Sequence, residues 1–292
     1  MTTPLDKFLV RAESLMDRLE VLLPPAPKVA DWTAPAFLWR KRQGHGWLEA
    51  VHQPHRIQLE DLQNVDLQKS RIEQNTRQYV AGKSANNVLL TGARGTGKSS
   101  LVKGVLLKFM DQGLRLIEVE KEDLVDLPLI VDLIAGRPEK FILFCDDLSF
   151  ESGEPGYKAM KSVLDGSVAG MPQNLLVYAT SNRRHLMPES MRENLEAKHD
   201  ADGEIHPGET TEEKVSLSER FGLWLSFYPF SQDDYLAACN HWLKSFGVTP
   251  EQIASARTEA LQWAQGRGSR SGRVAWQFAR DYAGHMGDGS AA

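Results

Sequence analysis

One segment of the chain combines residue types and spacing that suit phosphate binding. Residues 92–99 read Gly-Ala-Arg-Gly-Thr-Gly-Lys-Ser, which fits the pattern G-x-x-x-x-G-K-[ST]. Glycines let backbone N–H groups approach phosphate oxygens, because no side chain blocks the approach. Lys98 can reach the β- and γ-phosphates of a nucleotide, and the Ser99 hydroxyl can ligate Mg²⁺. The predicted nucleotide-binding residues here are Gly92, Ala93, Arg94, Gly95, Thr96, Gly97, Lys98, Ser99 and Ser100.

The segments on both sides agree with a phosphate-binding loop. Residues 87–91 are a short apolar run that ends at Gly92 and is typical of a strand. Residues 100–107 are typical of a helix, whose N-terminal dipole would add to the anion site. A glycine-rich turn with an incidental lysine is the alternative, and both flanks disfavour it.

Two carboxylates follow a second apolar run. Residues 141–145 are typical of a buried strand, and Asp146 and Asp147 come directly after it. In an open α/β sheet, ligands bind at the carboxyl ends of the strands. We expect Asp146 to hold Mg²⁺ and Asp147 to act on the attacking water. The alternative is an acidic turn, because aspartate is common at such positions.

A further predicted strand, residues 174–179, runs into Thr180, Ser181 and Asn182. A polar side chain at this strand end could hydrogen-bond the γ-phosphate or the attacking water, although Ser and Asn also cap turns. The chain has no Asn-Lys-x-Asp motif for reading guanine, which disfavours a GTPase. The histidines show no paired spacing typical of a metal site.

The elements that would position these residues alternate along the chain from residue 57. Continuous apolar runs separated by helices favour a parallel sheet covered on both faces. Only helices are predicted from Ser231 onward, with starts at Ser231, Thr249 and near Ser271. We predict an α/β fold with five parallel strands. The expected divisions are a helical N-terminal extension (1–56), a nucleotide-binding core (57–230), a helical lid (231–286) and a disordered tail (287–292).

Two N-terminal segments carry alternative interpretations. Residues 5–23 have the apolar spacing of an amphipathic helix that stops at Pro24 and Pro25. It could dock on a partner or pack on its own domain. Residues 32–55 look irregular, and the basic residues between Trp39 and Trp47 could bind single-stranded nucleic acid or form an ordinary surface.

Residues 198–213 are polar and glycine-containing, which predicts a mobile loop.

Composition limits the classes of protein to which this chain can belong. The 292 residues are 41% hydrophobic and 25% charged, which is ordinary for a globular protein. The net charge of 34 − 39 = −5 gives no general reason to expect nucleic acid or an anionic membrane as partner. Two cysteines exclude a disulfide framework and suit a reducing compartment. Without a membrane-length apolar run or a signal peptide, we expect a cytoplasmic protein.

The order of these motifs resembles that of the AAA+ ATPases. The phosphate loop is followed by the strand ending in Asp146-Asp147, the polar strand end, Arg220-Phe221-Gly222 before a last strand, and C-terminal helices. The chain resembles even more closely an uncharacterised bacterial AAA+-like family. The stretches that carry this likeness are NTRQYVAGKSANNVLLTGARGTGKSSLVKGVL, FILFCDDLSFE, EEKVSLSERFGLWLSF and SGRVAWQFARDY.

The resemblance implies ATP and Mg²⁺ as cofactors and assigns roles to particular residues. Asp146 would be the Walker B metal residue, Asn182 the sensor 1 residue, Arg220 an arginine finger, Arg273 the sensor 2 residue with Arg270 the less favoured choice, and residues 62–65, including Val65, neighbours of the adenine. Because an arginine finger acts on a neighbouring subunit, the resemblance also implies a homo-oligomeric ring or open ring. The alternative for Arg220 and Arg273 is an ordinary exposed arginine.

One position departs from the AAA+ pattern. Many members carry Glu where this chain has Asp147, and the shorter side chain would sit about one methylene further from a bound water. The leading hypothesis is a Mg-dependent ATPase acting on an unknown partner. The alternatives are an ATP-switched scaffold with little hydrolysis, a nucleic-acid-linked ATPase, and a small-molecule kinase. The last is disfavoured because the sequence shows no obvious substrate pocket.

Overall fold

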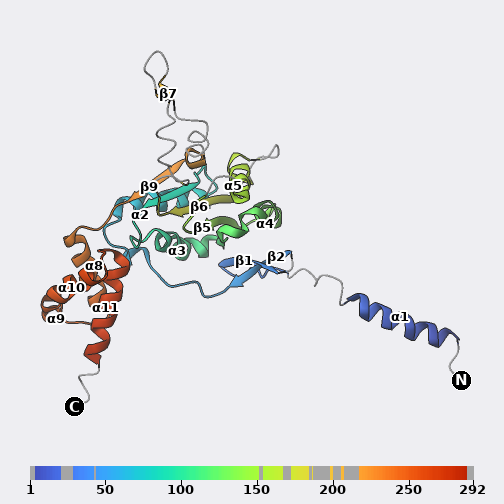
Figure 1. The fold of residues 1–292 in the computed structure, drawn as a ribbon, viewed down its shortest axis with the longest axis horizontal. Helices are drawn as coiled ribbons and strands as arrows, with labels where there is room; N and C mark the ends of the chain where they lie inside the picture. The colour runs from blue at the N-terminus through green and yellow to red at the C-terminus, as the bar shows by residue number, and fades with distance from the viewer. Residues whose placement is uncertain are drawn as a thin grey trace.

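The computed structural model describes residues 4–20, 29–42, 44–150, 154–166, 172–183, 186, 198–199, 205–206 and 217–287. A central sheet is covered by helices, and a bundle of four further helices lies beside it (Figure 1). Within these ranges no helix is both long and apolar enough to cross a bilayer.

The sheet contains seven strands in the order β2-β1-β4-β5-β6-β3-β9. They are β1 (Ala36–Arg42), β2 (His45–Val51), β3 (Val88–Gly92), β4 (Leu114–Glu118), β5 (Lys140–Cys145), β6 (Leu175–Ser181) and β9 (Leu223–Phe227). All neighbours are parallel except β1 and β2, which form an antiparallel hairpin. The predicted α/β class and parallel sheet are confirmed. The short strands β7 (Lys198–His199) and β8 (Ile205–His206) pair separately.

The hairpin corrects two expectations. The sheet has seven strands rather than five, and Ala36–Arg42 and His45–Val51 are strands rather than irregular structure. Among the described residues of the predicted N-terminal extension, only α1 (Pro4–Glu20) is helical. The hairpin joins the sheet because β1 pairs with β4, with Phe37 opposite Ile117. Trp39 is only 2% exposed, and its Nε1–H donates to Asp126 at 3.2 Å. Its burial anchors the hairpin.

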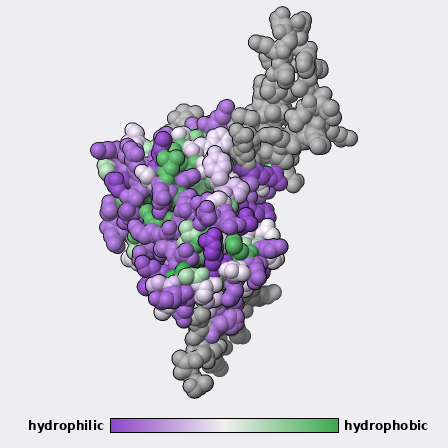
Figure 2. All heavy atoms as spheres, turned by 90° about the vertical axis from the view of Figure 1, so that its left-hand side faces the viewer, coloured by the Kyte–Doolittle hydropathy of each residue, from purple (hydrophilic) through white to green (hydrophobic). Residues whose placement is uncertain are grey.

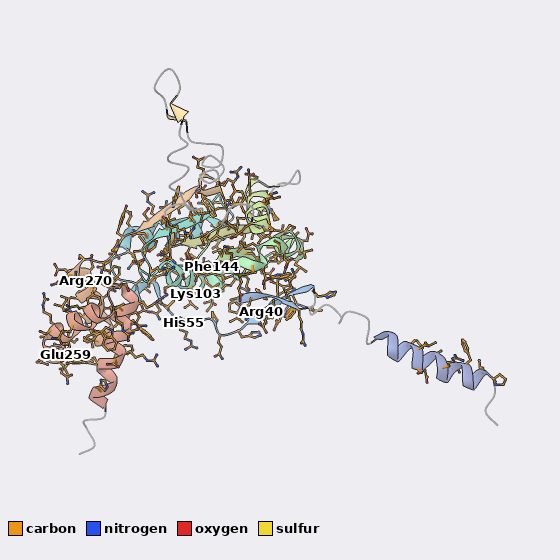
Figure 3. The ribbon with its side chains drawn as sticks, viewed as in Figure 1. Arg40, His55, Lys103, Phe144, Glu259 and Arg270 are labelled. Atoms are coloured by element: carbon orange, nitrogen blue, oxygen red, sulfur yellow. The ribbon has the colours of Figure 1, made fainter. Side chains whose placement is uncertain are left out.

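Helices cover both faces of the sheet. On one face lie η3 (Lys121–Asp126), α4 (Leu127–Ile134) and α5 (Pro155–Asp165), and on the other lie η1 (Leu59–Asp61), α2 (Asp66–Val80), α3 (Lys98–Phe109) and η2 (Met110–Gln112). Successive strand residues point to opposite faces. In β5, Leu143 therefore packs against the first group and Phe144 against the second. Phe144 lies in the middle of the molecule (Figure 3).

The C-terminal helices form their own core. They are α8 (Gln232–Ser245), α9 (Pro250–Ser255), α10 (Arg257–Gly266) and α11 (Gly272–Gly287). Tyr235 and Phe278 are buried at the centre of this group. Ser231 and Thr249 form capping boxes, so the predicted helix starts are confirmed. We call these four helices the lid. The domain divisions at 56/57 and 230/231 stay predictions.

Several predicted features fall outside the described residues. The last residues of the predicted N-terminal helix and the prolines after it belong to residues 21–28, and most of the predicted loop 198–213 and residues 288–292 are also outside. The described part of the first helix, α1, stands apart from the rest of the chain (Figure 1).

Replacing Asp126 by alanine is expected to destabilise the attachment of the hairpin. The buried indole N–H of Trp39 loses the carboxylate that it donates to, and an unsatisfied buried donor costs about 1–3 kcal/mol. Urea denaturation measures the free energy of unfolding. The control is Asp132→Ala on the exposed face of α4, where we expect a change within about 0.5 kcal/mol. Equal stability of the two variants would contradict this role for Asp126.

Candidate nucleotide-binding site

The loop at residues 92–99 connects β3 to α3, as the sequence predicts. Gly92 has φ of 123°, and a Cβ at this position would lie 1.9 Å from the Phe227 carbonyl oxygen of β9. Gly97 precedes the helix with φ of 98°. Because side chains rarely adopt these dihedrals, both glycines are required by the backbone. The first turn of α3 begins at Lys98 and points its N–H groups at the loop.

The Lys98 side chain lies inside this loop. Its Nζ donates to the carbonyls of Gly92 at 2.8 Å and Ala93 at 2.7 Å, and to Asn182 Oδ1 at 3.0 Å. Burial lowers the pKa of Lys98, and the carboxylates of Asp147 and Asp146 act in the opposite direction. The ammonium is thus held by three neutral oxygens, which charged phosphate oxygens would outcompete as acceptors.

Asp146 lies at the end of β5, where the predicted metal residues meet. Its carboxylate accepts hydrogen bonds from the hydroxyl of Ser99 and from Thr180 Oγ1 at 2.6 Å. Ser99 belongs to α3 and Asp146 follows β5, so the fold brings together two residues 47 positions apart. A hydroxyl and a carboxylate beside a phosphate loop are oxygen ligands of the kind that Mg²⁺ takes.

Asp147 is held by two neighbours at the end of β6. Its backbone N–H donates to Thr180 Oγ1 at 2.9 Å, and its Oδ1 accepts a hydrogen bond from Asn182 Nδ2. The backbone of Asp147 has φ of 50°, a left-handed conformation that Asp tolerates better than most residues. Asn182 therefore joins the carboxylate of Asp147 to the ammonium of Lys98. Thr180 belongs to the same polar strand end as Asn182, and its hydroxyl links Asp146 to the backbone of Asp147.

The last helix of the lid, α11, begins against the phosphate loop. The backbone N–H of Arg273 donates to the Gly95 carbonyl at 3.1 Å, and a Cβ on Gly95 would lie 2.7 Å from Ser271 Oγ. The positive charges of Arg273 and Arg94 also contribute to the lowered pKa of Lys98. Arg273 thus lies beside the loop. Arg270 is exposed in the lid (Figure 3).

Residues 62–65 run between the loop and the lid. The Leu62 side chain would lie 3.4 Å from a Cβ on Gly97. Asn64 Nδ2 donates to the Asp234 carbonyl of α8 at 2.9 Å, and Gln63 Nε2 lies 3.3 Å from His241 Nδ1. Val65 is buried against the α2 and α3 side of the sheet. The proximity of Val65 to an adenine stays a prediction.

Arg220 lies away from this cluster. It precedes β9, and Leu223 pairs with Val88 whereas Phe227 pairs with Gly92. About 13 Å of strand therefore separate the start of β9 from the level of the phosphate loop. The Arg220 guanidinium donates to the carboxylate of Asp165 at the end of α5. Arg220 is consequently at the opposite end of the sheet from its own chain's loop.

The segment that suggested nucleic-acid binding is built into the sheet edge. Trp39 is buried, and Lys41 Nζ donates to Asp126 at 2.8 Å. Arg40 pairs with Glu49 at 2.9 Å and with Glu120 at 3.3 Å, at the hairpin end of the molecule (Figure 3). These contacts favour a structural role for Trp39, Arg40 and Lys41.

The sheet, the loop between β3 and α3, and the polar ends of β5 and β6 define a P-loop α/β protein. The chain belongs to the family described as Protein of unknown function (DUF815), which matches residues 32–286. A search of curated proteins finds no match.

Two solved structures illustrate the similarity at the level of the fold. The Thermotoga maritima RuvB Holliday junction branch migration motor is 12% identical with a TM-score of 0.41, over 78% of this chain and 72% of that chain. The Aeropyrum pernix ORC1 protein in complex with DNA is 15% identical with a TM-score of 0.47, over 78% of this chain and 61% of that chain. Likeness this distant says nothing of what the present chain binds.

Proposed function

We propose that the protein binds Mg·ATP between the α/β core and the lid and hydrolyses it as an AAA+-type ATPase. The observation that carries this proposal is one hydrogen-bonded network. It joins Lys98, Ser99, Asp146, Asp147 and Asn182 across α3 and the ends of β5 and β6. Phosphoryl transfer to water uses groups of this kind: a buried lysine, a carboxylate that can hold a metal ion, and a second carboxylate oriented by an amide.

Each residue of the network has a distinct task. Lys98 would exchange its carbonyl partners for phosphate oxygens, with Arg273 adding a second positive charge from the lid. Ser99 and Asp146 would hold Mg²⁺, which supplies charge neutralisation at the phosphates. Asp147 would accept the proton of the attacking water, and Asn182 would fix the orientation of that carboxylate.

The lid contact supports coupling between nucleotide and conformation. Gly95 belongs to the phosphate loop, and its carbonyl binds the first turn of α11 through the Arg273 N–H. Phosphates bound in the loop would attract the Arg273 side chain. The position of the lid would then depend on which nucleotide is bound. We infer that this movement acts on a partner protein, whose identity the site does not specify.

Arg220 would complete the site of a neighbouring copy. Its position at the opposite end of the sheet supports action in trans, and a ring or open ring of copies would follow. Two variants separate the two halves of such a shared site. Lys98→Ala loses the phosphate loop but keeps the finger, and Arg220→Ala keeps the loop but loses the finger.

We expect wild-type protein to release phosphate from Mg·ATP, each variant alone to lose most turnover, and their mixture to recover part of it. Removing a finger costs about 10³–10⁵ in rate where it has been measured. The control is a mixture of Lys98→Ala with Lys98→Ala/Arg220→Ala, which should stay inactive. If Arg220→Ala released phosphate at the wild-type rate, Arg220 would not be an arginine finger. If the wild-type protein released no phosphate, the proposal of ATP hydrolysis would be wrong.

A second candidate is a scaffold switched by ATP binding. It is favoured by the short Asp147 side chain, which the Asn182 amide already engages. This candidate predicts nucleotide-dependent assembly without phosphate release. Mass measured in solution with and without a slowly hydrolysed ATP analogue, alongside the phosphate assay, separates the two candidates.

A further inference from the structure

Helix α1 exposes an apolar face. Leu5, Phe8, Leu9, Leu15 and Met16 recur at helical spacing, and each is between 51% and 68% exposed. Contiguous apolar side chains of this kind mark a binding surface more often than a free surface. Figure 1 shows α1 apart from the sheet and the lid, so its apolar face is not covered by the described part of its own chain.

A second row of exposed apolar side chains runs from the end of η3 along α4. Val125, Leu129 and Leu133 are spaced by four residues and are between 42% and 54% exposed. We call these three residues the α4 row. The opposite side of the helix packs inward, since Leu127, Ile130 and Ile134 are fully buried. By contrast, the face that carries the lid is mostly hydrophilic (Figure 2).

The chain that leads from α1 enters the fold beside α4. Arg137 comes shortly after the end of α4, and its guanidinium carbon lies 3.9 Å from the centre of the Trp32 ring. Asp126 comes directly before the start of α4, and its carboxylate pairs with Lys41. Residues 21–28 connect α1 to this point and can span at most about 30 Å. The C-terminal end of α1 is therefore held within about 30 Å of the point where its own chain enters the fold beside α4.

We propose that α1 of one copy docks on the α4 row of a second copy. Side chains spaced by four residues form ridges that pack into the grooves of another helix, which is the geometry that both rows offer. Because α1 stands apart from the sheet and the lid of its own chain (Figure 1), a neighbouring copy is favoured over the same chain as the partner of α1. Exposed Arg11 beside the α1 face and exposed Asp132 beside the α4 row offer opposite charges at the rim.

Disulfide trapping in the full chain tests this contact. Cys145 and Cys239 are buried and leave a low background. A tagged chain with Phe8→Cys or Leu15→Cys, two turns apart on α1, is mixed with an untagged Leu129→Cys chain under mild oxidation. The matched control replaces Leu129→Cys with Leu67→Cys on α2, because Leu67 is 65% exposed and lies outside the α4 row. We expect roughly tenfold more tagged–untagged dimer with Leu129→Cys, reflecting a raised local concentration.

Two outcomes overturn the proposal. One is equal trapping by Leu129→Cys and Leu67→Cys in both mixtures. The other is a bond formed within single chains of the Leu15→Cys/Leu129→Cys double variant while the mixtures stay unlinked, which would place α1 on its own α4. As a second measurement, Leu129→Glu is expected to lower the dimer fraction in solution, whereas Leu67→Glu leaves it unchanged. A chain that is monomeric at every concentration also overturns the contact. None of these results depends on ATP binding, so the proposed function can fail or stand separately.

Discussion

Replacing Lys98 by alanine is expected to weaken ATP binding by about 100-fold, which corresponds to about 2.7 kcal/mol. Lys98 is 6% exposed, and its ammonium already points into the loop, where it binds the Gly92 and Ala93 carbonyls. Charge-assisted hydrogen bonds contribute about 1.5–3 kcal/mol each, so the loss of contacts to two phosphates accounts for an effect of this size. Titration calorimetry or a fluorescent ATP analogue measures the dissociation constant.

Lys103→Ala is the matched control for this measurement. Lys103 lies on the same helix α3 (Figure 3), five residues beyond Lys98, and its Nζ lies 3.8 Å from the Glu118 carboxylate. We expect wild-type affinity for this variant and a similar melting temperature for both variants. If Lys98→Ala and Lys103→Ala bound ATP equally well, the assignment of residues 92–99 as the phosphate loop would be wrong.

The features that could be predicted from the sequence follow either from patterns of neighbouring residues or from the general geometry of a parallel sheet. The strand before Gly92 and the helix after it follow from an apolar run and a glycine pattern, and both lie where they were expected. The adjacency of Asp146 and Asn182 to the loop was also predictable, because the carboxyl ends of parallel strands meet at one edge. The structure places Lys98 and Asp147 on the same Asn182 side chain.

The features that were missed depend on contacts distant in sequence. From the sequence, Trp39, Arg40 and Lys41 look like a surface cluster in an irregular segment. Only pairing with β4 and the carboxylate of Asp126 makes them part of the sheet. Thr180 was missed for a similar reason. Its hydroxyl matters because it donates to Asp146 and accepts from the Asp147 backbone, a relation that no local pattern encodes.

Replacing Asp147 by asparagine is expected to reduce phosphate release by at least about 100-fold, the lower end of what a positioned general base contributes. Asparagine keeps the size of the side chain and tolerates the left-handed backbone at φ of 50°. Its amide oxygen can still accept from Asn182, but it cannot take a proton from water. ATP affinity should therefore stay within a few-fold of wild type.

Asp147→Glu is the comparison variant for this prediction, because it keeps the carboxylate and lengthens the side chain. If the carboxylate of Asp147 is too short for its water, one added methylene should raise turnover, because catalysis is sensitive to displacements of about 1 Å. The cost is the left-handed backbone, which glutamate tolerates less well than aspartate. Steady-state phosphate release, with ATP affinity measured in parallel, compares the three proteins. Equal turnover by wild type and Asp147→Asn would place the base elsewhere. Negligible turnover by wild type and a gain in Asp147→Glu would instead favour the ATP-switched scaffold, in which the site holds ATP without cleaving it.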